Sequence, residues 1–517
     1  MSGNRYHRRY MAVLGVDIGT TSAKAIAFTT EGRRLAAAQE EYALIRPKPG
    51  YYELDSPGML AAVGKVIGAV CTEVGRGKIR AIACSALGEA VLPVDADGNP
   101  LGNTVLALDH RATDQARALA ESIAPEEFFR ITGQALHPIA SICKILWWRE
   151  HEPELFARTR RFLCWNEMLA LHLGVRPAIS PSLAARTGLY DLRAGAWSQR
   201  LMQLADLSEE RLGCIAAAGE VVDRVARASA DQLGLHPRCV YVSGGWDQAC
   251  AALGCGAVRE GIVVNSMGST DSLNATYRGI HTSQAMLDCR FTCTPAAVAG
   301  LYCTNAFSLS GGNLLAWFRD HLDAERAKRL AGEGRDYFTQ LIEEAVHSRH
   351  PALVLAHFAG SGTPYMDADS RGAVLGLSLA SEKADIARGV VEGIALEMAQ
   401  NLEALGRSGI PAESIHAGGG GARNRRILQM RADAFNRPLV PLEVEEAGCL
   451  ACGMLAARAL DPSLQLQQLA ESWVRRGSPV MPRPEQAARL ARKREIHARL
   501  YPALRELNHL IAELQDS

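Results

Sequence analysis

The chain has 517 residues, of which 48% are hydrophobic, and it carries 56 Lys plus Arg against 56 Asp plus Glu. A single compact core seldom grows to this length, so we expect two large domains. The balanced charge excludes a protein-wide attraction to nucleic acid or to an anionic membrane surface. Recognition must therefore be local, and the partner is expected to be a small molecule.

Cysteine usage and the N-terminus indicate where the protein works. The thirteen cysteines are odd in number and scattered through apolar stretches, which is typical of reduced thiols in the cytoplasm. Cys449-x-x-Cys452 has no second pair at metal spacing, so we interpret it as helix packing and not as a zinc or redox site. No continuous apolar run reaches the roughly 18 residues of a membrane span. Residues 1–10, MSGNRYHRRY, lack the apolar core of a signal peptide and are expected to form a disordered basic arm.

The first half of the chain predicts a mixed α/β layout. Residues 11–44 alternate apolar and polar positions around a turn at Glu31-Gly32, which predicts two or three antiparallel strands. Helical periodicity follows at 58–74, and IRAIACSAL at 79–87 returns to a strand. A mainly helical region covers 114–220, and the strand CVYVSGG then leads into Trp246-Asp247-Gln248.

The second half repeats the pattern of a strand, a glycine turn and a second strand. GIVVNSMGSTDSLNA at 261–275 is again a β-branched run that meets a glycine-hydroxyl turn before an alternating run. Half of the chain separates the two turns, so we predict an N-terminal domain at 11–257 and a C-terminal domain of the same plan at 258–517. A helix is expected at about 382–406, a strand then opens into a helix through a glycine joint, and amphipathic helices close the fold after Pro484.

Three glycine-rich loops suggest a nucleotide. Two are the turns Gly19-Thr20-Thr21 and Gly268-Ser269-Thr270, and the third is the joint Gly418–Gly421. Glycine lets the backbone N–H groups approach an anion, although each turn alone is also ordinary for a hairpin. The joint has neither the lysine ending of a Walker A loop nor a dinucleotide fingerprint with its ribose acid. We therefore expect a nucleotide in a cleft between two similar domains.

Motifs along nearly the whole chain from Met11 resemble one family. They are VDIGTTSAK (16–24), the E-x-D-x-P of Glu53, Asp55 and Pro57, LDHR (108–111), SICKILWWREHEPELF (141–156), GGWDQ (244–248), GST (268–270), AGSGTPY (359–365) with RGAVLGL (371–377), GGGARNRRILQMRAD (419–433) and EEAGCLACG (445–453). By these motifs the chain resembles the FGGY carbohydrate kinases, which include xylulokinase and glycerol kinase.

The resemblance implies a fold and an activity. The fold is a two-domain α/β architecture of the actin and hexokinase type, which is ribonuclease H-like. Each domain holds a mixed sheet flanked by helices, and ATP lies in the interdomain cleft. The N-terminal domain would bind the sugar and catalyse the reaction, and the C-terminal domain would bind ATP. The activity is Mg²⁺-dependent transfer of the γ-phosphoryl group of ATP to a small sugar or polyol, with a xylulose-like ketose favoured. No nucleic acid or membrane partner is implied, and a homodimer is one expected assembly.

The resemblance also gives the acids and one lysine their roles. Asp247 is the expected proton acceptor, and the alternative is a helix cap near Gln248. Asp17 is expected to hold Mg²⁺ through water, with Asp247 as the second metal-facing carboxylate, because a carboxylate at the end of a buried strand needs a compensating charge. Lys24 matches a basic position that points to the γ-phosphate, and the alternative is a solvated lysine at a strand edge.

Further residues are assigned to the two substrates. For the acceptor we expect Glu89, Asp109, Arg111, Asp247, Gln248 and Trp246, with core packing as the alternative for Trp246. For ATP we expect Gly19, Thr20, Thr21, Gly268, Ser269, Thr270, Gly312, Asn313, Gly419, Gly420 and Asn424. The chain departs from its named relatives at Glu89, where xylulokinase-like sequences carry histidine. It also has Gly88 where glycerol kinase has the arginine of an arginine-glutamate pair.

Two other functions are compatible with a nucleotide cleft. The first is a nucleotide-driven switch or chaperone of the same fold, which would have no acceptor cluster around Glu89, Asp109 and Arg111. The second is a catalytically silent sugar sensor, which would be expected to have lost one of Asp17, Lys24 or Asp247. All three of these residues are present.

Overall fold

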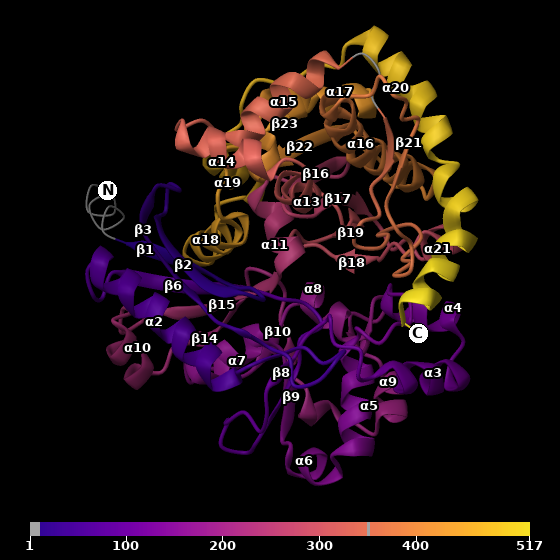
Figure 1. The fold of residues 1–517 in the computed structure, drawn as a ribbon. Helices are drawn as coiled ribbons and strands as arrows, with labels where there is room; N and C mark the ends of the chain where they lie inside the picture. Colours follow the sequence, from indigo (N-terminus) through magenta and orange to yellow (C-terminus); the bar gives the residue numbers. More distant parts are fainter. Residues whose placement is uncertain (1–10, 349–351, 517) are drawn as a thin grey trace.

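A computed structural model describes residues 11–348 and 352–516 and shows two six-stranded sheets flanked by helices (Figure 1). The basic arm predicted at 1–10 lies outside the described residues. The first sheet has the order β14-β15-β6-β1-β2-β3 and the second β18-β19-β17-β16-β22-β23. The strands of the first sheet are β1 (Ala12–Ile18), β2 (Ser22–Thr29), β3 (Arg34–Glu41), β6 (Ile79–Ala86), β14 (Val221–Arg224) and β15 (Val240–Trp246). Those of the second are β16 (Ile262–Met267), β17 (Asp271–Arg278), β18 (Thr294–Pro295), β19 (Leu301–Ser308), β22 (Ser414–Gly418) and β23 (Leu439–Pro441).

The two sheets follow the same plan. In the first, β1 runs antiparallel to β2 and parallel to β6, which is parallel to β15. In the second, β16 runs antiparallel to β17 and parallel to β22, which is parallel to β23. The order β3-β2-β1-β6-β15 therefore matches β19-β17-β16-β22-β23 strand by strand. The predicted two-domain α/β fold with a mixed sheet in each half is confirmed.

Helices cover both faces of the first sheet, which explains why β1 is apolar from Ala12 to Val16. One face packs against α2 (Ser56–Val74), which contacts β2 and β3. The Asp55 side chain caps this helix by accepting from the Gly58 N–H at 3.0 Å. By length and mean hydropathy α2 is long and apolar enough to cross a membrane. The helix is not a continuous apolar run, because Lys65 and Glu73 interrupt it. Its packing against β2 and β3 accounts for its apolar face.

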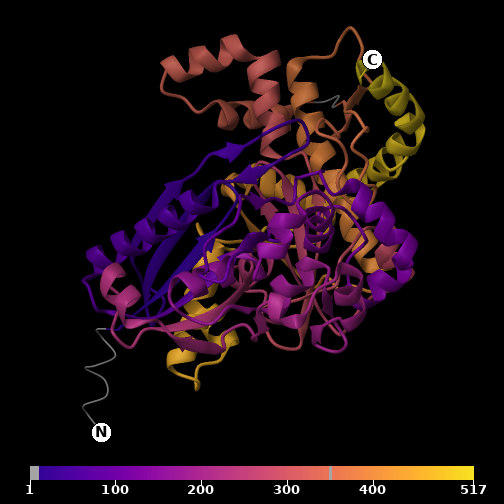
Figure 2. The same cartoon turned by 90° about the horizontal axis from the view of Figure 1, so that it is seen from below.

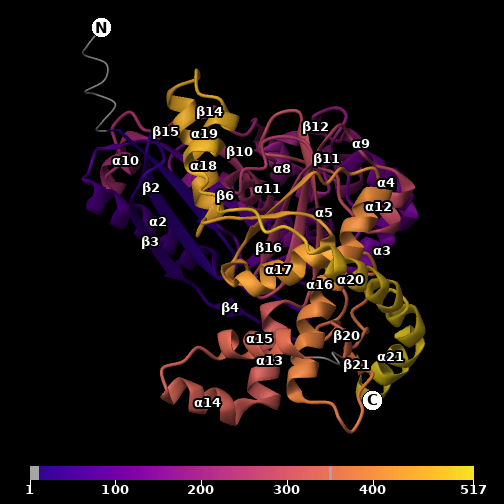
Figure 3. The same ribbon diagram turned by 90° about the horizontal axis from the view of Figure 1, so that it is seen from above.

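The opposite face of the first sheet packs against a helix from the other half of the chain. This helix, α18 (Ala447–Leu460), contacts β1, β6 and α11 (Asp247–Gly254), and Figure 3 shows it beside these elements. The backbones touch, because a Cβ added at Gly15 would lie 2.0 Å from the Cys449 carbonyl oxygen. Cys449 and Cys452 are both buried on α18 within this packing, as their helical interpretation predicted.

The second sheet packs against α16 (Lys383–Arg407), which contacts β17 and β19, and α17 (Arg425–Phe435) packs on α16. Helices α13 (Gly312–Leu322), α14 (Ala324–Gly332) and α15 (Tyr337–His347) lie at one end of the molecule, in salmon in Figure 2. The C-terminal helices α20 (Pro484–His497) and α21 (Leu500–Asp516) run along the outside of this half (Figure 1). Helix α11 joins the two halves, because the Asn274 side chain on β17 donates to the Gln248 carbonyl at 3.1 Å.

Candidate functional site

The site begins at one edge of the first sheet, where the carboxyl ends of three parallel strands meet. The strand register places Lys24, Asp17, Ser85 and Gly245 side by side across β2, β1, β6 and β15. Directly opposed residues in a sheet point to the same face, so these side chains share one side. The turn after Ile18, Glu89 after β6 and Asp247 after β15 all follow at this edge, where open α/β sheets bind their ligands.

Asp247 begins α11 but does not cap it. Trp246 occupies the N-cap position, and no side-chain cap bond is present there. The Asp247 Oδ1 atom is buried and has no hydrogen-bond partner among the described residues. Burial, the charge of Asp17 and the charge of Glu89 together raise the pKa of Asp247 to about 7. The geometry therefore disagrees with the capping alternative and leaves Oδ1 available for a ligand or a proton.

Asp17 lies within electrostatic reach of Asp247 and faces the first turn of α18. A Cβ added at Gly448 would lie 2.8 Å from Asp17 Oδ1, so a glycine is needed for this approach. Burial raises the pKa of Asp17, whereas Ser85 and the charge of Lys24 lower it in part. Two acids that each repel the other's charge in one buried region are a suitable setting for a divalent cation.

Lys24 is held by an acid that the sequence interpretation did not include. Its Nζ lies 2.9 Å from Oε1 and 2.8 Å from Oε2 of Glu446, the residue before α18. Burial alone would lower the pKa of Lys24, but the hydrogen bond and charge of Glu446 raise it overall. Lys24 is thus neither a freely solvated edge lysine nor an unpaired cation. Glu446 belongs to the EEAGCLACG motif, which was the available signal.

Each of the two predicted phosphate turns is closed by a backbone hydrogen bond from its glycine, over three residues in the first turn and over two in the second. The Gly19 N–H donates to the Ser22 carbonyl at 3.0 Å, and the Gly268 N–H donates to the Thr270 carbonyl at 3.0 Å. The residues after each glycine, which are Thr20, Thr21, Ser269 and Thr270, are exposed. In the second turn, the N–H groups of Gly312 and Asn313 donate to the carbonyls of Gly268 and Ser269 at 2.9 and 3.0 Å. The start of α13 therefore holds the second turn in place.

A pocket lies between the second turn, α16 and α17. It is lined by Met267, Gly268, Asp271, Gly311, Gly312, Leu315, Val391, Ile394, Gly421, Ile427 and Arg431. Gly419 has φ +85°, and a Cβ there would lie 2.7 Å from the Met267 carbonyl oxygen, so the joint requires glycine. No atom lies near the Cβ position of Gly420. Aliphatic walls beside open glycine backbone suit a flat aromatic ring.

Two residues of the segment after the glycine joint have partners that the sequence did not indicate. Asn424, predicted to contact ATP, caps α17: its Oδ1 accepts from the Arg426 and Ile427 N–H groups at 3.0 and 3.3 Å. Its side-chain oxygen is therefore committed to the helix. The sequence interpretation missed the buried ion pair of Arg431 with Asp271, and Nε and Nη1 of Arg431 have no partner among the described residues. The GGGARNRRILQMRAD motif contains Arg431, but periodicity did not show that it faces the second turn.

Comparison with known proteins agrees with this geometry. Residues 12–254 match the FGGY family of carbohydrate kinases, N-terminal domain, and residues 263–460 match the C-terminal domain of the same family. The chain belongs to the FGGY carbohydrate kinases. It is 26% identical to a xylulose kinase of Lactococcus lactis over 98% of this chain and 99% of that one, and 26% identical to a gluconokinase of Bacillus subtilis over 87% and 88%. The crystal structure of ligand-bound xylulose kinase from Lactobacillus acidophilus has a TM-score of 0.87 at 24% identity, covering 96% of this chain and 98% of that one.

Family membership makes the protein a phosphotransferase with an alcohol group as acceptor, and FGGY kinases use ATP. The acceptor is not settled by these relatives, because xylulose kinases and gluconokinases match at similar identity. The acceptor region of this FGGY kinase must therefore be judged from its own side chains.

Asp109 and Arg111, predicted to bind the acceptor, are committed to each other. Arg111 donates through Nε and Nη2 to Asp109 at 2.8 Å each, and Asp109 also accepts from the Tyr52 N–H at 2.7 Å. The guanidinium lies 4.2 Å from the ring centre of Tyr51 and 5.0 Å from that of Trp147, and Glu53 pairs with it as well. With both side chains at most 4% exposed, this pair holds the loop before α3 (Thr113–Ser122).

Glu89, Trp246 and Gln248 are the other residues that the sequence assigned to the acceptor. Glu89 forms a buried ion pair with Arg186, which the sequence interpretation missed. The Arg186 guanidinium lies 4.5 Å from the ring centre of Trp246, whose side chain is buried. Trp246 therefore packs in the wall of the site, as its core alternative predicted. The backbone carbonyl of Gln248 accepts a hydrogen bond from the Asn274 side chain, and the residue is half-buried.

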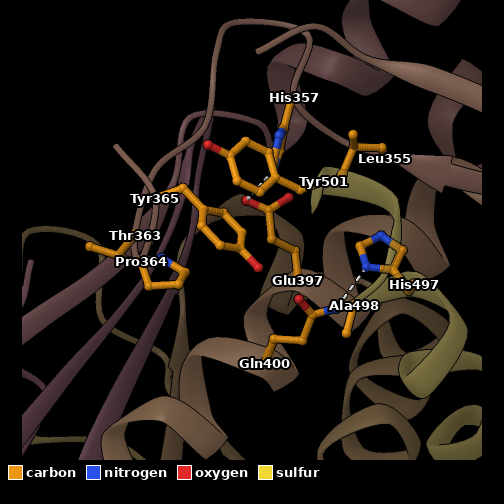
Figure 4. Close-up of a pocket in the computed structure, with 10 residues that line it drawn as sticks. All are labelled: Leu355, His357, Thr363, Pro364, Tyr365, Glu397, Gln400, His497, Ala498 and Tyr501. Carbon is orange, nitrogen blue, oxygen red and sulfur yellow. Dashed lines mark hydrogen bonds and ion pairs between the residues drawn. The ribbon is translucent and has the colours of Figure 1, made fainter. Parts of the chain in front are cut away.

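A second polar pocket lies away from this edge, between α16 and the C-terminal helices. It contains Glu397, whose Oε2 is buried without a partner among the described residues. Figure 4 shows the carboxyl group of Glu397 directed toward the rings of Tyr365, Tyr501 and His357. Burial lowers the pKa of His357 to about 4 and raises that of Glu397 to about 7. Their 3.8 Å contact is therefore not an ion pair between two charged groups at neutral pH.

Proposed function

We propose that the protein transfers the γ-phosphoryl group of ATP to a hydroxyl of a small sugar or polyol, and that a xylulose-like ketose is the preferred acceptor class. The observation that carries this proposal is Asp247. Its carboxyl group lies at the carboxyl end of β15, within reach of the charges of Asp17 and Glu89, and its buried Oδ1 has no partner among the described residues. Such a group can accept the proton of an attacking hydroxyl.

The proposed roles of the other residues follow from their positions. The exposed turns Gly19–Thr21 and Gly268–Thr270 would hold the phosphates, and the glycine-lined pocket beside α17 would hold the adenosine end. Lys24 would approach the γ-phosphate from its position against Glu446, which fixes its direction. We place the protein in the cytoplasm, in keeping with thirteen cysteines that are all free thiols.

Mg²⁺ fits the acids of the site. The described residues contain no group of three or more His, Cys, Asp or Glu that would hold a metal alone. Mg²⁺ is ordinarily bound by one or two carboxylates, with phosphates and water completing the shell, so Asp17 and Asp247 would suffice. When bound, the ion neutralises charge on the phosphates and on these two carboxylates.

The test is a screen of ADP release with MgATP and three- to six-carbon ketoses, polyols and sugar acids. The proposal expects strong stimulation by at least one of these acceptors in the wild-type protein and its loss in Asp247→Asn. ATP hydrolysis that no acceptor stimulates would instead support a nucleotide-driven switch. Full activity of Asp247→Asn would overturn the assigned base.

A further inference from the structure

The backbone at Glu89 is held in an unusual conformation at the acceptor side. Glu89 has φ +57°, a left-handed value that is uncommon for residues other than glycine. Its carbonyl oxygen accepts from Lys144 Nζ at 2.8 Å and from Ser141 Oγ at 3.1 Å, both from the first turn of α5 (Ser141–His151). Lys144 is fully buried. A strained backbone that buried groups stabilise in this way indicates a position fixed for function.

Arg186 contacts only one of the two carboxylate oxygens of Glu89. Arg186 donates from Nε at 2.7 Å and also from Nη2, and both donors reach the same oxygen, Oε1. Oε2 of Glu89 is therefore free of this pair. Nη1 of Arg186 is buried and has no hydrogen-bond partner among the described residues. A buried donor left without a partner is costly, so a ligand that supplies an acceptor is expected.

Gly88 and Trp246 fix the orientation of the guanidinium. A Cβ at Gly88 would lie 2.5 Å from Trp246 Nε1 and 3.5 Å from Arg186 Cγ. The absence of a side chain at position 88 thus makes room for the indole and for Arg186. The indole precedes Asp247 directly, and the charge of Arg186 lowers the pKa of Asp247 in part. The unpartnered Nη1 of Arg186 therefore lies within electrostatic reach of Asp247, the assigned base.

The charges of this group favour a neutral ligand. Glu89 compensates Arg186, and the Lys144 ammonium group is used by the Glu89 carbonyl. What remains is one donor, Arg186 Nη1, and one carboxylate oxygen, Glu89 Oε2. Two neighbouring hydroxyl groups can accept from the first and donate to the second. The carboxylate of a sugar acid would instead meet Glu89 and Asp247, and like charges that are poorly solvated repel.

We propose that Arg186 contacts the acceptor through Nη1 and that, paired with Glu89, it selects uncharged ketoses and polyols over sugar acids. This inference rests on the proposed kinase function. It assigns specificity to Arg186, which lies in the segment SPSLAARTGLYD at 180–191. No candidate residue named from the sequence lies in that segment.

Two substitutions of the full-length protein test the inference, with D-xylulose and D-gluconate as probes. Arg186→Lys keeps a cation beside Glu89 but removes Nη1. We expect the KM for xylulose to rise by roughly 10- to 100-fold, as for the loss of a hydrogen bond from a charged group, while kcat and the KM for ATP change little. Glu89→Gln leaves Arg186 without its counter-charge. We expect the ratio of kcat/KM for gluconate to that for xylulose to rise at least about tenfold. Arg193→Lys, at an exposed arginine of the same half, is the matched control and is expected to change neither quantity.

The outcomes separate this inference from the proposed function. If Arg186→Lys lowers kcat with an unchanged KM, or if the gluconate to xylulose ratio of Glu89→Gln equals that of the wild type, the inference is overturned. If Arg186→Lys does not fold, the ratio measured with Glu89→Gln decides alone. A wild-type preference for gluconate over every neutral acceptor overturns the charge argument but leaves a sugar kinase. Release of ADP that no acceptor stimulates overturns the proposed function itself.

Discussion

Asp247 and Glu397 are two buried acids that resemble each other in charge but differ in their surroundings. Each has one buried oxygen without a partner among the described residues, and burial is the main cause that raises each pKa to about 7. Asp247 follows a parallel strand, beside Asp17 and near exposed turn residues. Glu397 lies inside α16 and faces aromatic rings in a small pocket. A raised pKa therefore reports burial, and it is the position at the end of the sheet that distinguishes Asp247, the proposed catalytic acid, from Glu397.

The largest expected effect is a difference in kcat between variants of the two acids. Asp247→Asn should lower kcat by about 10³-fold, because the amide cannot accept the proton of the acceptor hydroxyl. Glu397→Gln should leave kcat within about twofold. Both variants remove one buried acid and preserve its shape, so each serves as the control for the other in the same ADP-release assay. Equal losses of kcat in the two variants would contradict the distinction.

The next largest effect is expected at Asp17, the acid whose charge acts on Asp247. Asp17→Asn should lower kcat by about 10²-fold and raise the Mg²⁺ concentration needed for half-maximal rate, because one of the two metal-facing carboxylates is lost. Titration of ADP release with MgCl₂ at fixed ATP measures both quantities. Chelation of Mg²⁺ should abolish the wild-type rate, and added Mg²⁺ should restore it. A Mg²⁺ dependence identical to that of the wild type would remove Asp17 from the metal site.

A smaller effect is expected at the cation of the same edge. Lys24→Met should lower kcat/KM for ATP by about tenfold, because a charge near the phosphates is lost. Glu446→Gln should have a smaller effect, since Lys24 keeps its charge and loses only a charged partner. The double variant should resemble Lys24→Met if Glu446 acts through Lys24. Additive losses would show that Glu446 has a separate role.

The smallest effect on activity is expected at Glu397, where ionisation should instead change stability with pH. Its pKa is about 7 in the folded protein and about 4.5 in the unfolded chain, so the unfolded state releases its proton first as pH rises. The stability that this group contributes is complete below pH 4.5 and is lost between pH 4.5 and about 7, up to about 3 kcal/mol. The charges of Asp271 and Arg431 act on Glu397, and His357 and His497, with pKa values of about 4, stay neutral above pH 5.

Denaturant unfolding at pH 5 and pH 8 measures this effect. The free energy of unfolding of Glu397→Gln, relative to the wild type, should be higher at pH 8 than at pH 5, because glutamine never ionises. The same comparison for the partly exposed Asp17→Asn should show a smaller difference. An unchanged relative stability of Glu397→Gln across this range would mean that Glu397 ionises in the folded protein as it does in the unfolded chain.

The sequence predicted local features well and distant partners poorly. The turns at Gly19 and Gly268 and the acid after β15 follow from periodicity and motifs, because each depends on neighbouring residues. Glu446 and Arg186 were missed because they lie 422 and 97 positions from Lys24 and Glu89, and no local pattern encodes such a pairing. Asp109 and Arg111 were assigned to the acceptor from their motif, and the motif did not show that they also bond to each other.

The packing of α18 also determines where the molecule is able to bend. Glycines at 15 and 254 bring the backbones of β1 and α11 against α18, and Trp473 of α19 (Leu466–Trp473) packs on Phe28, so these two helices are anchored to the first sheet. Leu442, by contrast, donates to the Ala417 carbonyl of the second sheet, and Val480 pairs with Leu439. The peptide chain thus passes between the halves at 255–261, at 444–446 and near 474, because residues 475–477 pair with 441–443 of the second half. Any rotation of one half against the other must be absorbed in these three short crossings, and the second of them carries Glu446, which holds Lys24.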